Sequence, residues 1–188
     1  FGRPALNSLQ AHLLIGNAEL AEPFGRSVVL LVRHSADGAL GLILNRPTGA
    51  TLKQAWEKAS QVPCHRDATL FLGGPCEGPL VALHTHEFLL EFEVFPGLYF
   101  CGGKDKLERL AAQTEGTPAK FFAGYSGWSP GQLENEIARG GWSVMPARME
   151  HIFGNEDELW SKSSRYVADM AWRDALKIKQ APPDLSLN

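Results

Sequence analysis

Two apolar strands joined by a tight turn occupy residues 27–44, and this stretch constrains the fold more than any other part of the chain. The first strand reads SVVLLVRH, Asp37-Gly38 supplies the turn, and the second strand reads ALGLIL. An Asp-Gly pair between two apolar runs is a strong signal for a β-hairpin. We therefore expect a central hairpin here, preceded by an earlier strand at residues 12–15.

Helices and further strands follow the hairpin in mixed order. Thr51 can cap a short helix with apolar residues at helical spacing, and Ser129-Pro130-Gly131-Gln132 is a capping-box signature with the serine as N-cap. The sequence also predicts strands at residues 69–72, 80–84, 121–125 and 142–145, strand-like sequence over 88–100, and helices from about residue 105 and over 156–176. Because strands occur both in hairpins and between helices, we expect an α+β fold with a mixed sheet flanked by helices.

The length and composition fit one compact domain. The chain has 188 residues, of which 44% are hydrophobic, and this is enough for one sizeable core. We expect a single domain over residues 1–176 and a flexible tail over 177–188. The longest apolar runs are far short of the roughly 18 residues of a membrane span, so we expect no membrane association. Three widely spaced cysteines fit a reducing compartment, which predicts a cytoplasmic protein.

Several segments in a fixed order carry a family resemblance. They read HLLIGN, FGRSVVLLVRH, DGALGLILNRP, FLGGP, VALH, GYSGWSPGQLENEI, GGWSVMP and IFGNEDELW, and they span roughly residues 13–160. Together these segments resemble the AlgH/YqgE family of bacterial and plastid proteins. The resemblance implies a curved, largely antiparallel sheet and a link to transcriptional regulation through the alginate-regulating member, but no catalytic mechanism. The sequence departs from the family pattern at Asn17 and beyond Trp160.

The segment Gly124-Tyr125-Ser126-Gly127-Trp128 is superficially similar to a nucleophile elbow, in which Ser126 would be the acyl-transfer nucleophile. An elbow requires glycine where this chain has Trp128. In the resembling family the position of Ser126 is often alanine, which cannot act as a nucleophile. We therefore expect a tight turn anchored by Tyr125 and Trp128, with Trp128 largely buried and the next helix directing Leu133 and Ile137 inward.

Candidate ligand-binding residues come from turns at the ends of strands. Backbone N–H groups near residue 126 and the Arg46 side chain could hold an anion if the two turns meet. The alternative, which we favour, is that Asn45 and Arg46 satisfy turn carbonyls. The Gly73-Gly74 break permits close approach of either a ligand or a neighbouring strand.

His84 and His86 form an HxH pair, but a lone pair of histidines is more often hydrogen-bonded than bound to metal, so we expect no metal and no cofactor. The complete set of candidate ligand-binding residues is Asn45, Arg46, Gly73, Gly74, His84, Tyr125, Ser126 and Trp128.

Three functional hypotheses follow. The leading one is a non-enzymatic regulatory or adaptor protein that acts through a protein partner or a small anionic ligand. The second is an enzyme, or an anion- or nucleotide-binding protein, with a cleft formed by Arg46, Gly73-Gly74 and residues 124–127. The third, direct DNA binding, is disfavoured by the net charge of −3 and would need a local basic face. The three turns, at Asn45-Arg46, Gly73-Gly74 and residues 124–127, distinguish the first two hypotheses. If they converge on one cleft the second is favoured, and if they only tie the core together the first is favoured.

Overall fold

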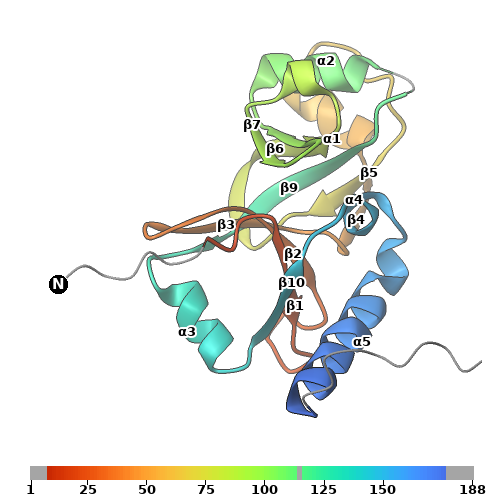
Figure 1. Ribbon diagram of the computed structural model, residues 1–188. Helices are drawn as coiled ribbons and strands as arrows, with labels where there is room; N and C mark the ends of the chain where they lie inside the picture. Colours follow the sequence, from red (N-terminus) through yellow and green to blue (C-terminus); the bar gives the residue numbers. More distant parts are fainter. Residues whose placement is uncertain (1–7, 114–115, 177–188) are drawn as a thin grey trace, which may run out of the picture.

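The computed structural model describes residues 8–113 and 116–176, which form one α+β domain built on a curled, largely antiparallel sheet (Figure 1). The strands are β1 (His12–Gly16), β2 (Val28–Ser35), β3 (Gly38–Ile43), β4 (Pro47–Thr51), β5 (Thr69–Leu72), β6 (Cys76–His84), β7 (Phe92–Phe95), β8 (Leu98–Cys101), β9 (Ala119–Trp128) and β10 (Trp142–Pro146). The helices are α1 (Leu52–Ala59), the 3-10 helix η1 (Glu87–Leu89), α2 (Lys104–Ala112), α3 (Gln132–Ala138), α4 (Met149–Phe153) and α5 (Glu156–Ala175). The predicted fold class is confirmed.

The predicted hairpin is formed by β2 and β3, which pair antiparallel. Residues 28–32 are all fully buried, although successive side chains of a strand point to opposite faces. Leu30 packs in the central cluster, to which α4 and α5 contribute, whereas Leu31 packs in a second cluster, to which α3 contributes. The continuous apolar run therefore reflects a strand that is covered on both faces.

Strand β9 is the connection between the two parts of the sheet. It pairs antiparallel with β3 and β6 and parallel with β5. Helices α1 and α2 lie at one end of the molecule, beside β5 and β6, and helices α3 and α5 lie at the other end (Figure 1). The cluster under α1 and α2 includes Trp56, Leu107 and Phe121, so this end of the domain has its own apolar packing.

The two predicted helix caps have different outcomes. The cap of α1 is confirmed, because the Thr51 hydroxyl accepts the Gln54 N–H at 3.3 Å and the Gln54 side chain accepts the Thr51 N–H at 3.0 Å. The prediction that Ser129 caps α3 is wrong. Gly131 is the N-cap and adopts a left-handed φ of 76°, which moves the first helical residue to Gln132. The Gln132 side chain instead accepts the Ser129 N–H at 3.0 Å.

Three short elements were not predicted: β4, η1 and α4. The helix η1 covers the start of the stretch 88–100 that was predicted to be strand-like. The sequence predicted that Asn45-Arg46-Pro47 would end the hairpin strand, and β3 does end at Ile43, but the chain re-enters the sheet directly as β4, which pairs with β5. Helix α4 is only one turn long and precedes α5. The predicted flexible tail at 177–188 lies outside the described residues. None of the described helices combines the length and the apolar character that a membrane span needs.

The two caps give a matched test. Thr51→Ala should lower the free energy of unfolding by about 1 kcal/mol, because one helix-terminal N–H loses its acceptor. Ser129→Ala should change it by less than about 0.5 kcal/mol, because the exposed hydroxyl caps nothing. Urea unfolding of both variants measures the difference. A larger loss in Ser129→Ala than in Thr51→Ala would contradict this assignment of the α3 start.

Candidate functional site

The side chains of Asn45 and Arg46 fasten the corner after β3 to the loop before β2. The side-chain Oδ1 of Asn45 accepts the Val28 N–H at 2.9 Å, and the side-chain Nδ2 of Asn45 donates to the Arg26 backbone carbonyl at 3.0 Å. The Arg46 guanidinium donates to the Gly25 carbonyl. Both side chains therefore satisfy backbone groups, which favours their structural interpretation over anion binding.

Gly73 and Gly74 lie directly against β9. A Cβ atom on Gly73 would lie 2.2 Å from the Gly124 carbonyl oxygen, and one on Gly74 would lie 2.3 Å from the Ser126 hydroxyl oxygen. The buried Ser126 hydroxyl donates to the Gly73 carbonyl at 3.0 Å, while Tyr125 is half-buried and packs against the central cluster. The close approach at these glycines is thus used by a neighbouring strand.

The prediction of a tight turn at residues 124–128 is wrong, because these residues continue β9 and its last three pair with β3. This part of β9 lies close to the segments at residues 45–46 and 73–74 through backbone contacts. The Leu72 N–H donates to the Arg46 carbonyl at 2.8 Å, and the Ile43 N–H donates to the Gly73 carbonyl at 3.0 Å. Since Gly73 also contacts Gly124 and Ser126, the chain itself occupies the space where the three segments meet. Ligand binding at these segments stays a prediction, and no contact of the described residues supports it.

Trp128 belongs to an aromatic cluster that holds α3 against the sheet. Trp128 and Trp142 donate their indole N–H groups to the same carboxylate oxygen of Glu136, each at 2.9 Å, and their rings meet edge to face. Leu133 is fully buried beside them, and Ile137 packs against the same cluster. The predicted burial of Trp128, which is 6% exposed, is confirmed.

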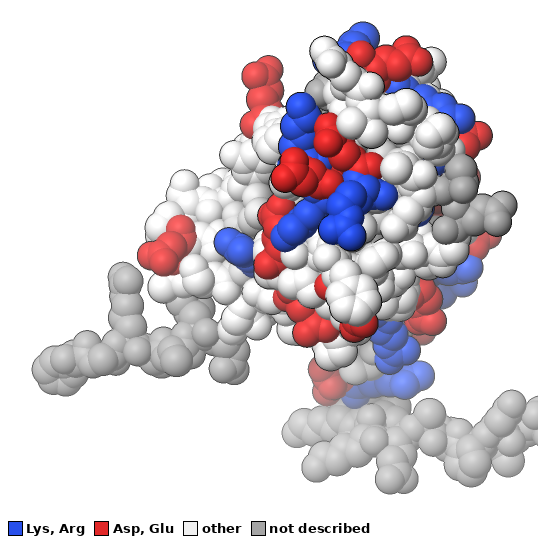
Figure 2. Space-filling view, turned by 90° about the horizontal axis from the view of Figure 1, so that it is seen from above, with Lys and Arg blue, Asp and Glu red and all other residues white. Residues whose placement is uncertain are grey.

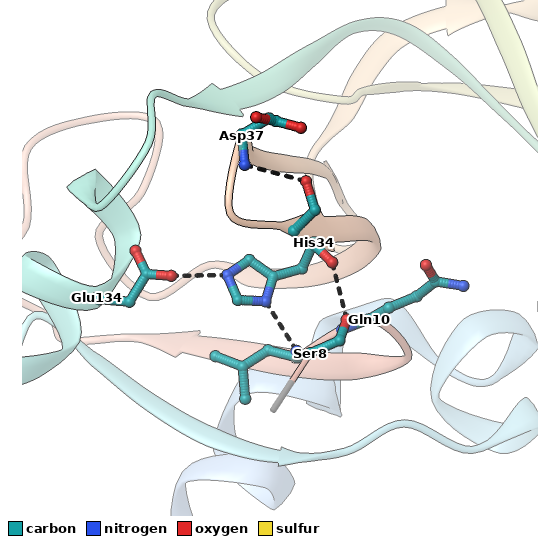
Figure 3. A network of polar contacts seen from close by, with 7 residues as sticks. Ser8, Gln10, His34, Asp37 and Glu134 are labelled. Atoms are coloured by element: carbon teal, nitrogen blue, oxygen red, sulfur yellow. Dashed lines mark hydrogen bonds and ion pairs between the residues drawn. The ribbon is translucent and has the colours of Figure 1, made fainter. Parts of the chain in front are cut away.

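His34 has a similar structural role at the other side of α3 (Figure 3). Its Nδ1 accepts the Leu9 N–H at 2.8 Å, and its Nε2 donates to Glu134 Oε1 at 2.8 Å. The Ser8 hydroxyl donates to the His34 carbonyl at 2.8 Å. Because Nδ1 acts as an acceptor, the neutral ring carries its proton on Nε2. Both ring nitrogens are occupied, so this buried histidine connects β2, the N-terminal segment and α3.

His84 differs from the other candidate residues because one of its polar atoms has no partner. It is fully buried at the end of β6, and its Nδ1 accepts the His86 N–H at 3.2 Å. The proton of the neutral ring therefore lies on Nε2, and no described residue accepts it. A buried donor without an acceptor is costly and requires an explanation.

Arg66 presents the same feature beside His84. It is 9% exposed and donates from Nη1 to the Thr117 carbonyl at 2.9 Å, but its Nε and Nη2 have no partner among the described residues. Burial, together with the neighbouring His86, Arg66 and Lys106, lowers the pKa of His84 to about 4. We refer to Arg66, His84, His86 and Lys106 as the His84–Arg66 cluster.

The unpartnered atoms of Arg66 and His84 are hydrogen-bond donors, whereas His86 Nδ1, which also has no partner among the described residues, donates or accepts according to its tautomer. The Lys106 ammonium donates to the Leu90 carbonyl at 2.6 Å, and the nearby Glu91 carboxylate already accepts the N–H groups of Gly102 and Gly103. Neither Arg66 nor Lys106 forms an ion pair within the described residues. Among these residues, no group of three histidine, cysteine or carboxylate side chains could hold a metal ion. What the unpartnered N–H groups require is an acceptor, such as the oxygen of an anion.

Sequence reasoning found His84 through its HxH spacing but did not find Arg66 or Lys106. Arg66 lies in residues 60–68, which have no apolar periodicity, and its partner Thr117 is distant in sequence. No local pattern identifies such a residue. A buried arginine becomes recognisable only when its surroundings are known.

Comparisons with known proteins give a consistent result. The family model described as AlgH-like, DUF179, matches residues 13–170. A UPF0301 protein of Chlorobaculum tepidum is 36% identical over 160 residues, which cover 81% of this chain and 83% of that protein. A UPF0301 protein of Chlamydia caviae is 34% identical over 186 residues, covering 92% of this chain and 94% of that protein.

Two solved structures are similar to this one. The solution structure of the AlgH protein from Pseudomonas aeruginosa has a TM-score of 0.70 and 28% identity, and the match covers 98% of this chain and all of the other. The crystal structure of a protein from Corynebacterium diphtheriae has a TM-score of 0.68 and 23% identity, with 88% of each chain covered. The second similarity shows the fold alone.

Replacement of Trp128 tests its structural role. Trp128→Ala should lower the free energy of unfolding by about 3 to 5 kcal/mol, because a buried ring and its bond to Glu136 are lost. The matched control is Trp172→Ala at an exposed site on α5, which should change stability by less than about 0.5 kcal/mol. Thermal or urea unfolding measures both. Native stability in Trp128→Ala would show that the ring belongs to a functional surface.

The buried His84 predicts a specific dependence of stability on pH. An unfolded histidine titrates near its ordinary pKa of 6.5, whereas His84 in the fold titrates near 4. Between these two pH values the unfolded chain binds more protons than the folded chain. The protein therefore loses stability as the pH falls from 6.5 toward 4. His84→Gln should reduce the slope of unfolding free energy against pH by up to about 1.4 kcal/mol per pH unit in this window.

Urea unfolding at several values between pH 4.5 and 7 measures that slope. The control is His65→Gln, the same replacement at an exposed position, and the slope should fall more in His84→Gln than in this control. Equal slopes in His84→Gln and the wild-type protein would contradict the burial of a neutral imidazole at this position.

Proposed function

The chain belongs to the AlgH-like family, and from this premise we propose that it is a non-enzymatic regulatory or adaptor protein that responds to a small anionic ligand at the His84–Arg66 cluster. The observation that carries the proposal is the set of buried N–H groups on Arg66 and His84 that have no partner within residues 8–113 and 116–176. Transcriptional regulation, which the family resemblance implies, is the process in which we place this binding activity. A protein partner stays a prediction.

The type of ligand follows from the donors. The planar guanidinium group of Arg66 presents Nε and Nη2 side by side, a geometry that suits two oxygens of one carboxylate or phosphate group. Nε2–H of His84 would supply a third bond. Because His84 is fully buried and Arg66 almost so, the part of the ligand that enters must be compact. A single oxyanion group meets both requirements.

The reactivity of nearby groups supports binding rather than catalysis. Burial and the charge of Glu91 raise the pKa of the Cys101 thiol to about 12, so Cys101 is not a thiolate near neutral pH. The low pKa of His84 makes it a weak base under the same conditions. The cluster therefore offers donors and positive charge but no activated nucleophile, and this favours the regulatory hypothesis over the enzymatic one.

The charge on the face that bears α2 gives no support to direct nucleic-acid binding there. Figure 2 shows the end of the molecule that bears α2, where basic and acidic side chains lie next to one another. Within α2 itself, Lys104 pairs with Glu108 at 3.9 Å. A mixed surface of this kind lacks the continuous basic footprint that binding to a phosphate backbone uses.

Titration with inorganic phosphate tests the proposal, with sulfate and acetate compared at matched ionic strength. We expect a saturable rise of the unfolding temperature and saturable changes in the NMR signals of Arg66 Nε and His84 Nε2. Arg66→Met should weaken binding at least about tenfold, because charge-assisted bonds are lost. Arg66→Lys should have an intermediate effect, since it keeps the charge but loses the planar fork.

The matched control is Arg109→Met, which removes an exposed arginine from α2 and should leave phosphate binding unchanged. Changes that do not saturate, or that depend only on ionic strength, would show that water rather than an anion satisfies the cluster, and the proposal would then fail. If Arg66→Met and Arg109→Met weaken phosphate binding equally, the effect comes from the overall charge of the protein and not from a specific site.

A further inference from the structure

A second buried cation, Lys120, lies in a different environment from the His84–Arg66 cluster. Lys120 is on β9 and is 7% exposed. Its Nζ lies 3.9 Å from the centre of the Phe71 ring and 3.5 Å from the Ile152 carbonyl oxygen, which is at the long limit for a hydrogen bond. Lys120 takes part in none of the ion pairs found within the described residues.

The side chain of Lys120 borders an open hollow of about 280 Å³. The walls come from β5, the start of β9, and the segment from α4 to the start of α5. They include the rings of Phe71 and Phe153 and the carboxylates of Asp67 and Glu156. The volume is near the lower end of the range for small-molecule sites, so a molecule of a few heavy atoms fits. Lys120 thus lines a space that a small reactant can enter.

The environment leaves a substantial fraction of this amine uncharged. Burial lowers the pKa of Lys120 to about 8, and the negative charge of Glu156 opposes the shift. At pH 7.5 about a quarter of the amine is therefore neutral, whereas an exposed lysine with its ordinary pKa is neutral to about one part in a thousand. Neutral amine is the nucleophilic form.

We infer that Lys120 is a nucleophilic amine that forms a reversible imine with a small uncharged aldehyde bound in this hollow. The lone pair on Nζ attacks the carbonyl carbon and gives a carbinolamine. The carbinolamine then loses its oxygen as water, with uptake of one proton, and leaves a protonated imine. No oxidant or reductant is required, and hydrolysis reverses the reaction.

The surroundings of Nζ suit both the reactant and the product. The protonated imine places a positive charge where the ammonium group was, over the face of Phe71 and near the Ile152 carbonyl. Asp67 and Glu156 disfavour entry of an anionic aldehyde and stabilise the cationic product. The structure therefore predicts a preference for uncharged aldehydes over those that carry a carboxylate.

The test is competitive labelling of the whole chain with benzaldehyde and sodium cyanoborohydride, which fixes the imine as a stable secondary amine. Peptide mapping by mass spectrometry compares Lys120 with the exposed Lys58 and Lys162 in the same molecule. At pH 7 we expect Lys120 to react at least about tenfold faster, with a half-maximal rate near pH 8. With glyoxylate, an anionic aldehyde, most of the difference in rate between Lys120 and the exposed lysines should disappear.

Two variants sharpen the comparison. Glu156→Gln should increase the rate at Lys120 with glyoxylate more than with benzaldehyde, because a negative charge leaves the hollow. The neighbouring Asp157→Asn, at an exposed position, should change neither rate. The inference is overturned if Lys120 in the folded wild-type protein reacts no faster than Lys58, or reacts only after unfolding. Because this comparison is made within the wild-type protein, it does not depend on the folding of any variant.

Discussion

The hydrogen bonding of β9 to three strands is the constraint on which the rest of the structure depends. Residues 121–123 of β9 pair with both β5 and β6, and residues 126–128 pair with β3, so this strand joins the end that carries α1 and α2 to the hairpin end that carries α3. The pairing brings the chain so close at Gly73 and Gly124 that a single Cβ atom would collide with backbone. Gly73, Gly74 and Gly124 are therefore required by strand packing, and the backbone of the chain itself fills the space between the segments that were candidates for a ligand site.

The same strand also separates the two candidate sites. His84 of β6 is paired with Ala119 of β9, and paired residues share a face of the sheet. Lys120 is the next residue, so strand alternation places it on the opposite face, with Phe122 and Phe71. The donors of His84 lie with the α1 and α2 packing, whereas the amine of Lys120 lies toward α4. Occupation of one site therefore requires no contact with the other.

The sequence could predict those parts of the structure that depend on residues close to one another in the sequence. The hairpin and the Thr51 cap were predicted because the turn residues and the capping partner lie within a few positions of one another. The Ser129 cap failed although its signature is local, because Gly131 can adopt a left-handed φ that the signature does not encode. Arg66 and Lys120 could not be found, since their burial depends on Thr117, Phe71 and Ile152, which only the fold brings near. His84 was found by spacing, but its unpartnered nitrogen follows from tertiary packing.

Burial shifts the pKa of Cys101, His84, Lys120 and Arg66, and the outcomes differ because these groups start from different pKa values. Burial raises the pKa of Cys101 to about 12 and lowers that of His84 to about 4, so both are neutral near pH 7. It lowers the pKa of Lys120 to about 8, so both the neutral amine and the charged ammonium form are populated near neutral pH. Burial also lowers the pKa of Arg66, but a guanidinium group starts so high that it keeps its charge. Arg66 is therefore the fixed charge of the His84–Arg66 cluster, and because two of its nitrogens have no partner in the part of the chain that the structure describes, it has the strongest physical requirement for an anion among these groups.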